Sequence, residues 1–502
     1  MGRRVASVRI GNRQKTSKPP KKEMAPTNAK PMITLERSGA AIPAPDRFCD
    51  IGAVRHPTGG SARTASEPER AHRTGRVICL VLAVWLCLLP LTGCKGSPEQ
   101  RKAVVFAVGG APAEVRVWEE IARQFSREQG VAVRILRQPT DTAQRRQELL
   151  VALGSQQRDP DVFLMDIAWL GLFAHAGWLA PLGNVDLGPF YARIVQQADR
   201  FAGKLVALPV SLDVGVLYYR KDLLHEAPPR SWQALAAAAL RIQRRMRPSH
   251  PGFFGFVWQG AQYEGLVVNF LDFAGSRGGF VFKGNRVRVD SPQNVAALAR
   301  MADFIHGVGI SPPNTYTEMK EEDVRRFFQS GDALFERNWP YAYALHQARG
   351  SPVRGKTGVS RLPGPVHGRS AATLGGWHVG VSAFSDVPVA ARRFALYLTS
   401  REVQRKLVMQ LGLPPGRRDL YTDPQVLAVY PHYRILAEVL RTARPRPMLP
   451  NYTLISAILQ RRLSGALAGD YPPARALALA QREIDALMAR TAASHPPEET
   501  SP

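Results

Sequence analysis

All four cysteines of this 502-residue chain lie within its first 94 residues, at Cys49, Cys79, Cys87 and Cys94. Residues 95–502 therefore contain no cysteine, and no disulfide can crosslink them. Without crosslinks, this part of the chain must be stabilised by burial of apolar surface alone, which requires a large core. About 400 residues are ample for two such cores, so we expect a body of two domains.

The last cysteine closes an apolar segment. Residues 77–91 (VICLVLAVWLCLLPL) are uncharged, Arg73 and Arg76 precede them, and Leu-Thr-Gly-Cys ends at Cys94. A basic flank, about 15 apolar residues and small residues before a cleavage site are typical of a secretory signal, whereas a spanning helix needs about 20 residues. Leu-small-Gly-Cys also resembles a bacterial lipobox, whose cysteine is acylated. We therefore predict a lipoprotein signal peptide at 77–94, a lipid anchor on Cys94 and a location on the periplasmic side of a bacterial membrane or at the cell surface. A plain signal peptide and an uncleaved signal anchor are the alternatives.

The segment before the signal has a different composition from the body. Residues 1–76 hold 16 Lys or Arg against 6 Asp or Glu and show no sustained apolar period. We predict that this extension is disordered, or that its start codon is assigned too early. The alternative is a basic arm that binds nucleic acid. Residues 491–502 are expected to form a disordered tail.

The remaining positive charge is scattered. Of the formal net charge of +26, the extension carries +10, which leaves +16 for the rest of the chain. Such a charge favours solubility or attraction to anionic lipid, and it does not identify a pocket. Because no DNA- or RNA-binding motif accompanies it, we expect no nucleic-acid partner.

The body begins with alternating strands and helices. Apolar spacing predicts a strand at 104–108, a helix from Val115 to Gly130, a strand at 131–136, a helix at 142–153 and a strand at 161–165. This order is typical of an α/β fold with a parallel sheet covered on both faces.

A different pattern follows at 205–219 (LVALPVSLDVGVLYY), where two β-type runs meet across 209–213 with no helix between them. We interpret this as a strand that leaves one sheet and enters another. An Ala-rich helix is expected at 231–247, and a further strand-like run at 374–382 interrupts the later helices. No period of 20 to 50 residues recurs. The sequence therefore predicts two α/β lobes joined by more than one crossing.

These residues resemble the extracellular solute-binding proteins of bacterial ABC importers, in the branch that binds trehalose, maltose and related sugars. The resemblance extends from Val104 to about Met488 and rests on seven pieces in the family's order. They are DPDVFLMDIAW (159–169), AGWLAPL (176–182), ALPVSLDVGVLYYRKDLL (207–224), WQGAQYEGL (258–266), GDALFERNWPYAY (331–343), LGGWHVGVS (374–382) and PPGRRDLY (414–421).

The resemblance implies the two-lobed periplasmic-binding-protein fold, with a cleft between the lobes and three hinge crossings. We place lobe 1 at 95–210 and 374–417, lobe 2 at 211–373 and 418–490, and the crossings near 209–213, 362–374 and 417–421. Hinge closure of the lobes would enclose the ligand.

A sugar site needs carboxylates or amides that accept hydrogen bonds, Arg that donates, and aromatic rings that cover the apolar faces of the sugar. The resemblance implies ligand contacts for Asp166 at a strand end, Trp169 three residues on, Asp213 at the first crossing, and Trp339 and Trp377 beside Gly or Pro. Asp166 could instead cap the following helix, Asp213 could brace the hinge, and the tryptophans could be core residues.

Charged residues extend the same site. Glu114, after the Gly-Gly turn, is expected to bind ligand, or else to be a first-turn helix carboxylate. Arg417 and Arg418 are candidates as a pair, of which one would reach the cleft and the other solvent. Arg145, with Arg146 as its competitor, is weaker. The string at 258–264 could be structural.

The family implies a protein that is not an enzyme. No Gly-x-Ser-x-Gly, His-Glu-x-x-His, P-loop or dinucleotide fingerprint occurs, and we expect no cofactor and no metal. We expect a monomer that captures a neutral trehalose- or maltose-like oligosaccharide and delivers it to the transmembrane subunits of an ABC permease. Ser211 and His378 depart from the family pattern and leave the identity of the sugar open. A lipoprotein that presents its ligand to a sensor, and a binder of a sugar phosphate, are the alternatives.

Overall fold

The computed structural model describes residues 103–283, 286–364 and 372–494. The predicted extension at 1–76, the signal peptide at 77–94 and the lipidation site at Cys94 lie outside the described residues. All described residues belong to one compact unit of the chain, Gly93–Pro502. None of the helices in the described ranges is long and apolar enough to cross a bilayer.

The first lobe contains a five-stranded sheet in the order β2-β1-β3-β15-β6. Its strands are β1 (Ala103–Gly109), β2 (Ala132–Gln138), β3 (Val162–Asp166), β6 (Leu208–Pro209) and β15 (Trp377–Val381). Strand β1 is parallel to β2 and β3, whereas β15 is antiparallel to β3 and β6. The predicted β-α-β-α-β order at the start of the body is therefore confirmed.

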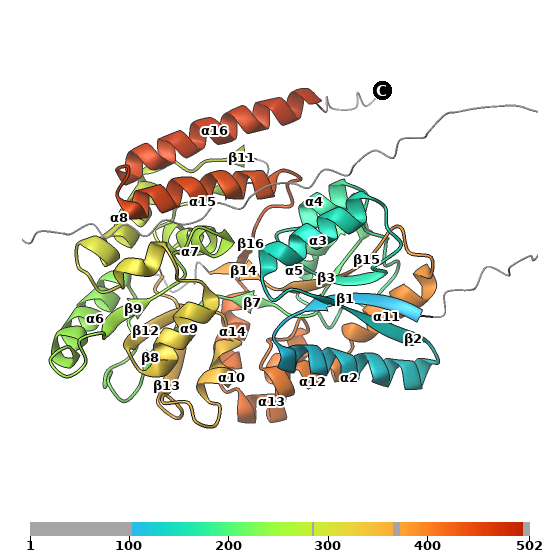
Figure 1. Cartoon of the computed structure of the whole chain (residues 1–502), viewed down its shortest axis with the longest axis horizontal. Helices are drawn as coiled ribbons and strands as arrows, with labels where there is room; N and C mark the ends of the chain where they lie inside the picture. Colours follow the sequence, from blue (N-terminus) through green and yellow to red (C-terminus); the bar gives the residue numbers. More distant parts are fainter. Residues whose placement is uncertain (1–102, 284–285, 365–371, 495–502) are drawn as a thin grey trace, which may run out of the picture. The chain divides into compact units, whose positions relative to one another are not determined.

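Helices cover both faces of this sheet (Figure 1). Successive residues of β1 point to opposite faces, as the period of a strand requires. Phe106 packs edge-on against Trp118 and Phe394 on one face, while Phe163 packs against Phe173 on the other. The covering helices are α2 (Pro112–Gln129), α11 (Pro388–Leu398) and α12 (Arg401–Leu411) on the first face, and α3 (Thr142–Gly154) and α4 (Leu170–His175) on the second.

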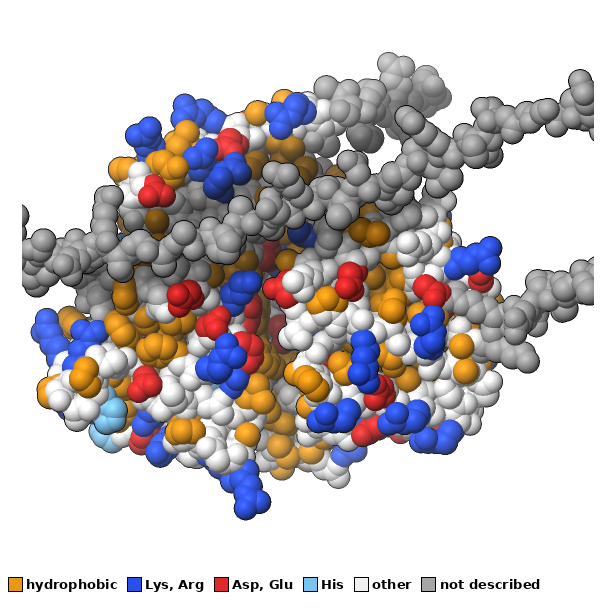
Figure 2. Space-filling view, in the orientation of Figure 1, with side chains coloured by type: hydrophobic (Ala, Val, Ile, Leu, Met, Phe, Trp, Pro, Cys, Tyr) orange, Lys and Arg blue, Asp and Glu red, His pale blue; other side chains and the backbone are white. Residues whose placement is uncertain are grey.

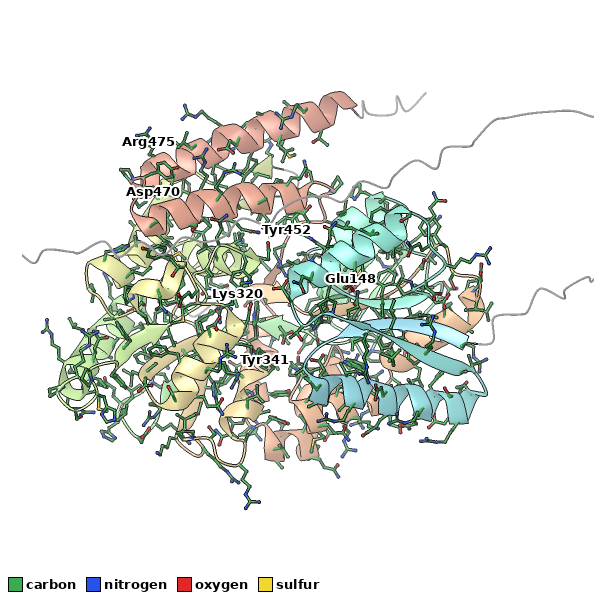
Figure 3. The ribbon with its side chains drawn as sticks, viewed as in Figure 1. Glu148, Lys320, Tyr341, Tyr452, Asp470 and Arg475 are labelled. Atoms are coloured by element: carbon green, nitrogen blue, oxygen red, sulfur yellow. The ribbon has the colours of Figure 1, made fainter. Side chains whose placement is uncertain are left out.

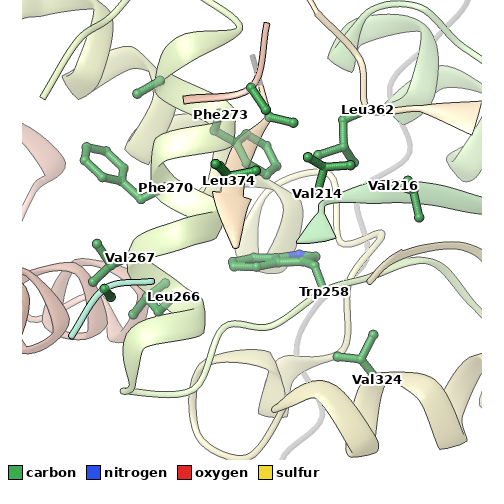
Figure 4. Packing of buried hydrophobic residues seen from close by; sticks show 14 of the residues in the cluster. Val214, Val216, Trp258, Leu266, Val267, Phe270, Phe273, Val324, Leu362 and Leu374 are labelled. Carbon is green, nitrogen blue, oxygen red and sulfur yellow. The ribbon is translucent and has the colours of Figure 1, made fainter. Parts of the chain in front are cut away.

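The second lobe contains a four-stranded sheet in the order β13-β8-β12-β9. Its strands are β8 (Val216–Arg220), β9 (Phe254–Val257), β12 (Ala333–Asn338) and β13 (Thr357–Arg361). Its helices are α6 (Trp232–Met246), α7 (Glu264–Gly275), α8 (Pro292–His306), α9 (Glu321–Ser330), α15 (Tyr452–Ala468) and α16 (Pro473–Ser494). Trp232 stacks on Phe273 with ring centroids 3.8 Å apart, and Figure 4 shows Trp258 close to Val214 and Leu374 in the same core.

Three segments of the chain run side by side between the lobes. The first leaves the first sheet at β6, forms β7 (Asp213–Val214) and enters the second sheet at β8. The second contains β14 (Thr373–Gly375), which pairs with β7 and with β16 (Arg444–Pro445). The third segment follows α12 and contains Pro415, which forms a β-bridge with Ser211 of the first segment. The predicted switch of sheets at 209–213 and the three crossings of the fold are thus confirmed.

Gly376 allows the second segment to turn from one sheet into the next. Its φ is 132°, a backbone conformation that L side chains rarely adopt. A Cβ at this position would lie 2.3 Å from the carbonyl oxygen of Ser211. Trp377, directly after it, exchanges backbone hydrogen bonds with Ser211. The glycine therefore allows the first and second segments to lie in contact directly before Trp377, the first residue of β15.

Short elements complete the fold. They are α5 (Ala192–Ile194), the π-helix η1 (Val195–Asp199), β4 (Arg200–Phe201), β5 (Lys204–Leu205), β10 (Phe282–Lys283), β11 (Arg286–Val287), the 3-10 helices η2 (Pro313–Tyr316) and η3 (Arg418–Thr422), α10 (Ala342–His346), α13 (Pro424–Val429) and α14 (Tyr433–Leu440). Helix α16 continues to Ser494, so the first four residues of the predicted tail are helical; residues 495–502 lie outside the described part.

Candidate functional site

The two lobes face each other across a furrow, in which acidic side chains are visible (Figure 2). The carboxyl ends of β1, β2 and β3 lie on the first-lobe side, which is where ligand crevices form in α/β sheets. Figure 3 shows Glu148 of α3 on one side of the boundary and Lys320 and Tyr341 of the second lobe on the other. Residues along this boundary form the candidate site.

Glu114 and Arg145 meet at the end of β1. The Glu114 carboxylate lies over Gly110, where a Cβ would come within 2.2 Å of it. It accepts a hydrogen bond of 3.3 Å from Trp118 Nε1. Burial raises the pKa of Glu114, although the charge of Arg145 and the bond from Trp118 oppose the shift. Arg145 is 6% exposed and donates from Nε to the carbonyl oxygen of Pro139 at 2.7 Å.

Arg145 also supports an aromatic ring. Its guanidinium lies 4.9 Å from the ring centroid of Trp377, which is half-buried. Trp169 packs edge-on against the same ring at 5.8 Å and is itself 4% exposed. Trp377 therefore has one face on a cation and an edge against Trp169, which fixes the orientation of the ring.

Asp166 belongs to a bridge between the lobes. Its Oδ1 accepts from the backbone N–H of Ala168 at 2.8 Å and from Arg446 Nη2 at 2.9 Å. Arg446 Nη1 donates to Oε1 of Glu264, on the second lobe, at 2.9 Å. Glu264 also accepts from the hydroxyl of Tyr452 at 2.6 Å. Asp166 thus accepts a backbone hydrogen bond in the turn after β3 and at the same time binds a cation. It does not cap the following helix, because the N-cap residue of α4 is Trp169 and no side chain caps this helix.

The carboxylates of this bridge favour the charged form of Arg446. Burial alone would lower the pKa of Arg446, but the carboxylates of Asp166 and Glu264 raise it above its usual value. The side chain of Arg446 is 2% exposed. A buried cation is costly unless carboxylates accompany it, and Arg446 has two.

Asp213 lies where the first crossing enters β7, paired with Gly375. Its Oδ1 is buried and has no hydrogen-bond partner among the described residues. Burial, together with the negative charges of Asp166 and Glu114, raises the pKa of Asp213 to about 7. Three predicted site residues, Glu114, Asp166 and Asp213, are therefore close enough to influence one another.

Trp339 approaches the same place from the second lobe. A Cβ at Gly375 would lie 3.1 Å from the Trp339 ring and 3.6 Å from the Asp213 side chain. The Arg337 guanidinium lies 4.4 Å from the ring centroid. Trp339 Nε1 donates to Glu321 Oε1 at 3.5 Å. Trp339 and Trp377 are thus matched, because each is a half-buried ring with an arginine on one face.

Arg417 and Arg418 do not join this cluster. Arg417 forms an ion pair with Asp419 at 3.1 Å and lies against Phe190. Arg418 is exposed and donates to the carbonyl oxygen of Gly188. Each of these two arginines is thus engaged by a local neighbour, whereas Arg145, Arg337 and Arg446 contact the tryptophans and carboxylates of the cluster.

The other residues considered from the sequence have structural partners. Trp258 is fully buried and donates to Ser311, and Gln259 is fully buried and donates to the carbonyl oxygen of Arg337. His378 is fully buried and hydrogen-bonds Asp199, so its departure from the family pattern lies in the core.

Sequence reasoning did not find Arg446 or Glu321. Arg446 lies in a run with prolines at 445, 447 and 450. Such a run indicates an extended segment between helices, and this was the available signal. Within the described part of the chain, no group of three His, Cys, Asp or Glu is arranged to hold a metal ion.

A hollow elsewhere on the second lobe is separate from this cluster. It lies between β11 and α16 and is lined by Arg288, Gln481 and Asp485, among others. None of the residues described above lines it. We therefore assign the site to the boundary between the lobes.

Comparison with known proteins identifies the family. Residues 111–405 match the family model of the bacterial extracellular solute-binding proteins. The chain belongs to this family. A relative, a probable ABC transporter-binding protein of Deinococcus radiodurans, is 37% identical over 334 residues, which are 65% of this chain and 79% of the relative.

Solved structures agree with the family. Maltose-bound T. maritima MalE3 is 36% identical, with a TM-score of 0.71, and the match covers 77% of this chain and 99% of that chain. A solute-binding protein of Thermotoga lettingae bound to α-D-tagatose is 25% identical, with a TM-score of 0.68, over 76% of this chain and 98% of that chain. This protein therefore has the two-lobed fold of the solute-binding proteins that serve ABC importers. Members of the family bind solutes outside the cytoplasm and are not enzymes.

The pKa of Asp213 predicts how stability depends on pH. This pKa is about 7 in the folded protein and about 3.9 in an unfolded chain. Between about pH 4 and pH 7 the folded protein therefore keeps a proton on Asp213 that the unfolded chain has released. Stability should therefore fall as pH rises from about 4 to 7 and change little above. Asp213→Asn should remove this dependence, with a gain in stability on the order of 4 kcal/mol at pH 8 and about 1.5 kcal/mol at pH 5.

Urea unfolding of both proteins at pH 5 and 8 measures the effect. Asp470→Asn, at an exposed carboxylate of the second lobe, serves as the control and should leave the pH dependence intact. An unaltered pH dependence in Asp213→Asn would show that Asp213 titrates as it does in the unfolded chain.

Proposed function

We propose that this solute-binding protein captures a neutral disaccharide of the maltose or trehalose type between its lobes. It then delivers the sugar to the transmembrane subunits of an ABC permease. Acylated Cys94 would hold the protein at the membrane. The cleft residues are Glu114, Asp166, Asp213, Trp339 and Trp377, with Trp169 behind the last ring and Arg145 and Arg446 as the cations.

The observation that carries the proposal is the buried, unpartnered Oδ1 of Asp213. A buried carboxylate oxygen without a donor is costly, and a sugar hydroxyl supplies the missing donor. Glu114 and Asp166 add further acceptors nearby, because both act on the pKa of Asp213. A site with this excess of acceptors favours a ligand rich in hydroxyl groups.

The two tryptophans support a ligand with two apolar faces. Trp377 belongs to the first lobe and Trp339 to the second, and each is backed by an arginine. The C–H faces of a sugar ring pack on aromatic rings of this kind. Two rings from opposite lobes would each cover one unit of a disaccharide.

The nearby cations do not favour a phosphorylated ligand. Arg446 is already bound by Asp166 and Glu264, and Arg145 by the carbonyl oxygens of Pro139 and Thr140 and by the charge of Glu114. A phosphate would compete with these partners and would also lie near the carboxyl groups of Glu114, Asp166 and Asp213, where burial and the charges of the first two already raise the pKa of the third. The relatedness to a maltose-bound structure at 36% identity supports the same choice of ligand.

Alanine substitution of either tryptophan tests the site. If Trp339 and Trp377 cover sugar faces, each variant should lose about 1 to 3 kcal/mol of binding free energy, the range for a well-packed aromatic contact. The unfolding midpoint should change little, because both rings are only half-buried. A thermal-shift screen with maltose, trehalose, sucrose, glucose and maltodextrins first identifies the sugar, and calorimetry then measures the affinity.

The fully buried Trp258 provides the control. Trp258→Ala should lower the unfolding midpoint strongly, since loss of a core tryptophan costs about 3 to 5 kcal/mol. If Trp339→Ala and Trp377→Ala behaved in the same way, with lost stability and unchanged affinity, both rings would be core residues and the proposed site would be wrong.

Substitution of Cys94 tests the anchor. Cys94→Ala should leave the protein folded and able to bind sugar but release it from the membrane fraction, because a lipid chain is the proposed attachment. Cys87→Ala, inside the apolar segment, is the matched control and should stay at the membrane. Retention of Cys94→Ala in the membrane fraction would exclude lipidation at this position.

A further inference from the structure

Two charged residues meet across the cleft, away from the Arg446 bridge. Lys320 Nζ lies 3.5 Å from Asp141 Oδ2. Asp141 precedes α3 on the first lobe, and Lys320 precedes α9 on the second. The two side chains are 41% and 48% exposed, so the pair lies at the solvent edge of the cleft.

Each residue is fixed by the start of its own helix. Asp141 caps α3 by accepting a 3.0 Å hydrogen bond from the backbone N–H of Gln144 through Oδ1, which leaves Oδ2 for Lys320. Lys320 occupies the equivalent position of α9, where its backbone N–H donates to Asp323 at 3.2 Å. Its ammonium group also lies 5.5 Å from the ring centroid of Tyr263. Little conformational freedom is therefore lost when the pair forms.

The charge of Lys320 is felt at Asp141. Burial by itself raises the pKa of Asp141, but the hydrogen bond from Gln144 and the charge of Lys320 outweigh it and hold this pKa below its usual value. The carboxylate is thus ionised at neutral pH, and the pair is a true ion pair.

The helices that begin next to Asp141 and Lys320 each carry a residue that contacts one of the two tryptophans of the proposed site. Helix α3 carries Arg145, which lies against Trp377. Helix α9 begins with Glu321, which accepts from Trp339. The Asp141–Lys320 pair therefore joins the helix that contacts Trp377 to the helix that contacts Trp339.

We infer that Asp141 and Lys320 form a latch that holds the closed cleft and sets how long a sugar stays bound. This role deepens the proposed function and rests on it. The latch joins residues of opposite lobes, so it exists only when the lobes are close together. Sugar enters the open form, in which the pair is broken. The latch should thus slow dissociation, and because it also holds part of the ligand-free protein closed, it should slow association as well.

Stopped-flow kinetics with maltose, or with the sugar found by thermal shift, tests the latch in the full chain. Lys320→Gln and Asp141→Asn should each raise the dissociation rate constant about 2- to 5-fold, the range for an exposed ion pair. Asn keeps the helix cap of α3. The double variant should behave like either single variant, because both remove one interaction.

Two comparisons separate the latch from a general effect on stability. Lys320→Arg keeps the charge and should dissociate at close to the native rate. Glu226→Gln removes an exposed ion pair with Arg241 inside the second lobe and should not change the kinetics. The latch would be refuted by unchanged dissociation in both single variants, by independent multiplicative effects in the double variant, or by an equal effect of Glu226→Gln.

Lobe closure can also be measured without ligand. Spin labels at Arg123→Cys and Arg244→Cys, both exposed and on opposite lobes, report the distance between lobes when the four natural cysteines are replaced by Ser. Lys320→Gln should shift the distance distribution toward the open form; an identical distribution would contradict the latch. If the native protein bound none of the sugars, the proposed ligand would be wrong, while this measurement would still decide whether Asp141 and Lys320 hold the lobes together.

Discussion

One buried arginine joins the two lobes. Arg446 binds Asp166 of the first lobe and Glu264 of the second, with its side chain 2% exposed. A cation this deep in the protein needs a counter-charge, and loss of both Asp166 and Glu264 would leave an uncompensated buried charge. The bridge therefore fixes how the end of β3 faces the start of α7, and the rest of the cleft is arranged around that contact.

The crossings then determine which side chains share the cleft. Gly376 lets β14 turn into β15 against Ser211, which brings Trp377 beside Asp166 in the sheet register. Pairing of β14 with β7 places Asp213 next to Gly375, over which Trp339 lies. Carboxylates and rings from four separate parts of the chain meet because three backbone segments run side by side. This combination suits a ligand that is neutral and covered with hydroxyl groups.

Local patterns predicted the fold better than the site. The strands and helices from Ala103 to Asp166 follow from apolar periodicity, and the two abutting β-type runs at 205–219 revealed the first crossing. The role of Arg446 was not predictable in this way, because its partners lie 280 and 182 residues away in the chain. One of the pair Arg417 and Arg418 was expected in the cleft, but Asp419, two residues after Arg417, binds that arginine; this local partner was visible in the sequence. Tertiary packing decides between such candidates, and a single sequence does not contain it.

Calorimetry with a neutral and a phosphorylated sugar tests the central claim that the cleft selects a neutral ligand. Titrations with maltose and with glucose 6-phosphate at about 20 and 500 mM salt compare an uncharged ligand with one whose charge is screened by salt. We predict heat from maltose at both salt concentrations, with an affinity that changes less than about fivefold because only the exposed Asp141–Lys320 pair is screened, and no heat from the phosphate. Tight binding of glucose 6-phosphate that weakens with salt, without heat from maltose or trehalose, would contradict this account.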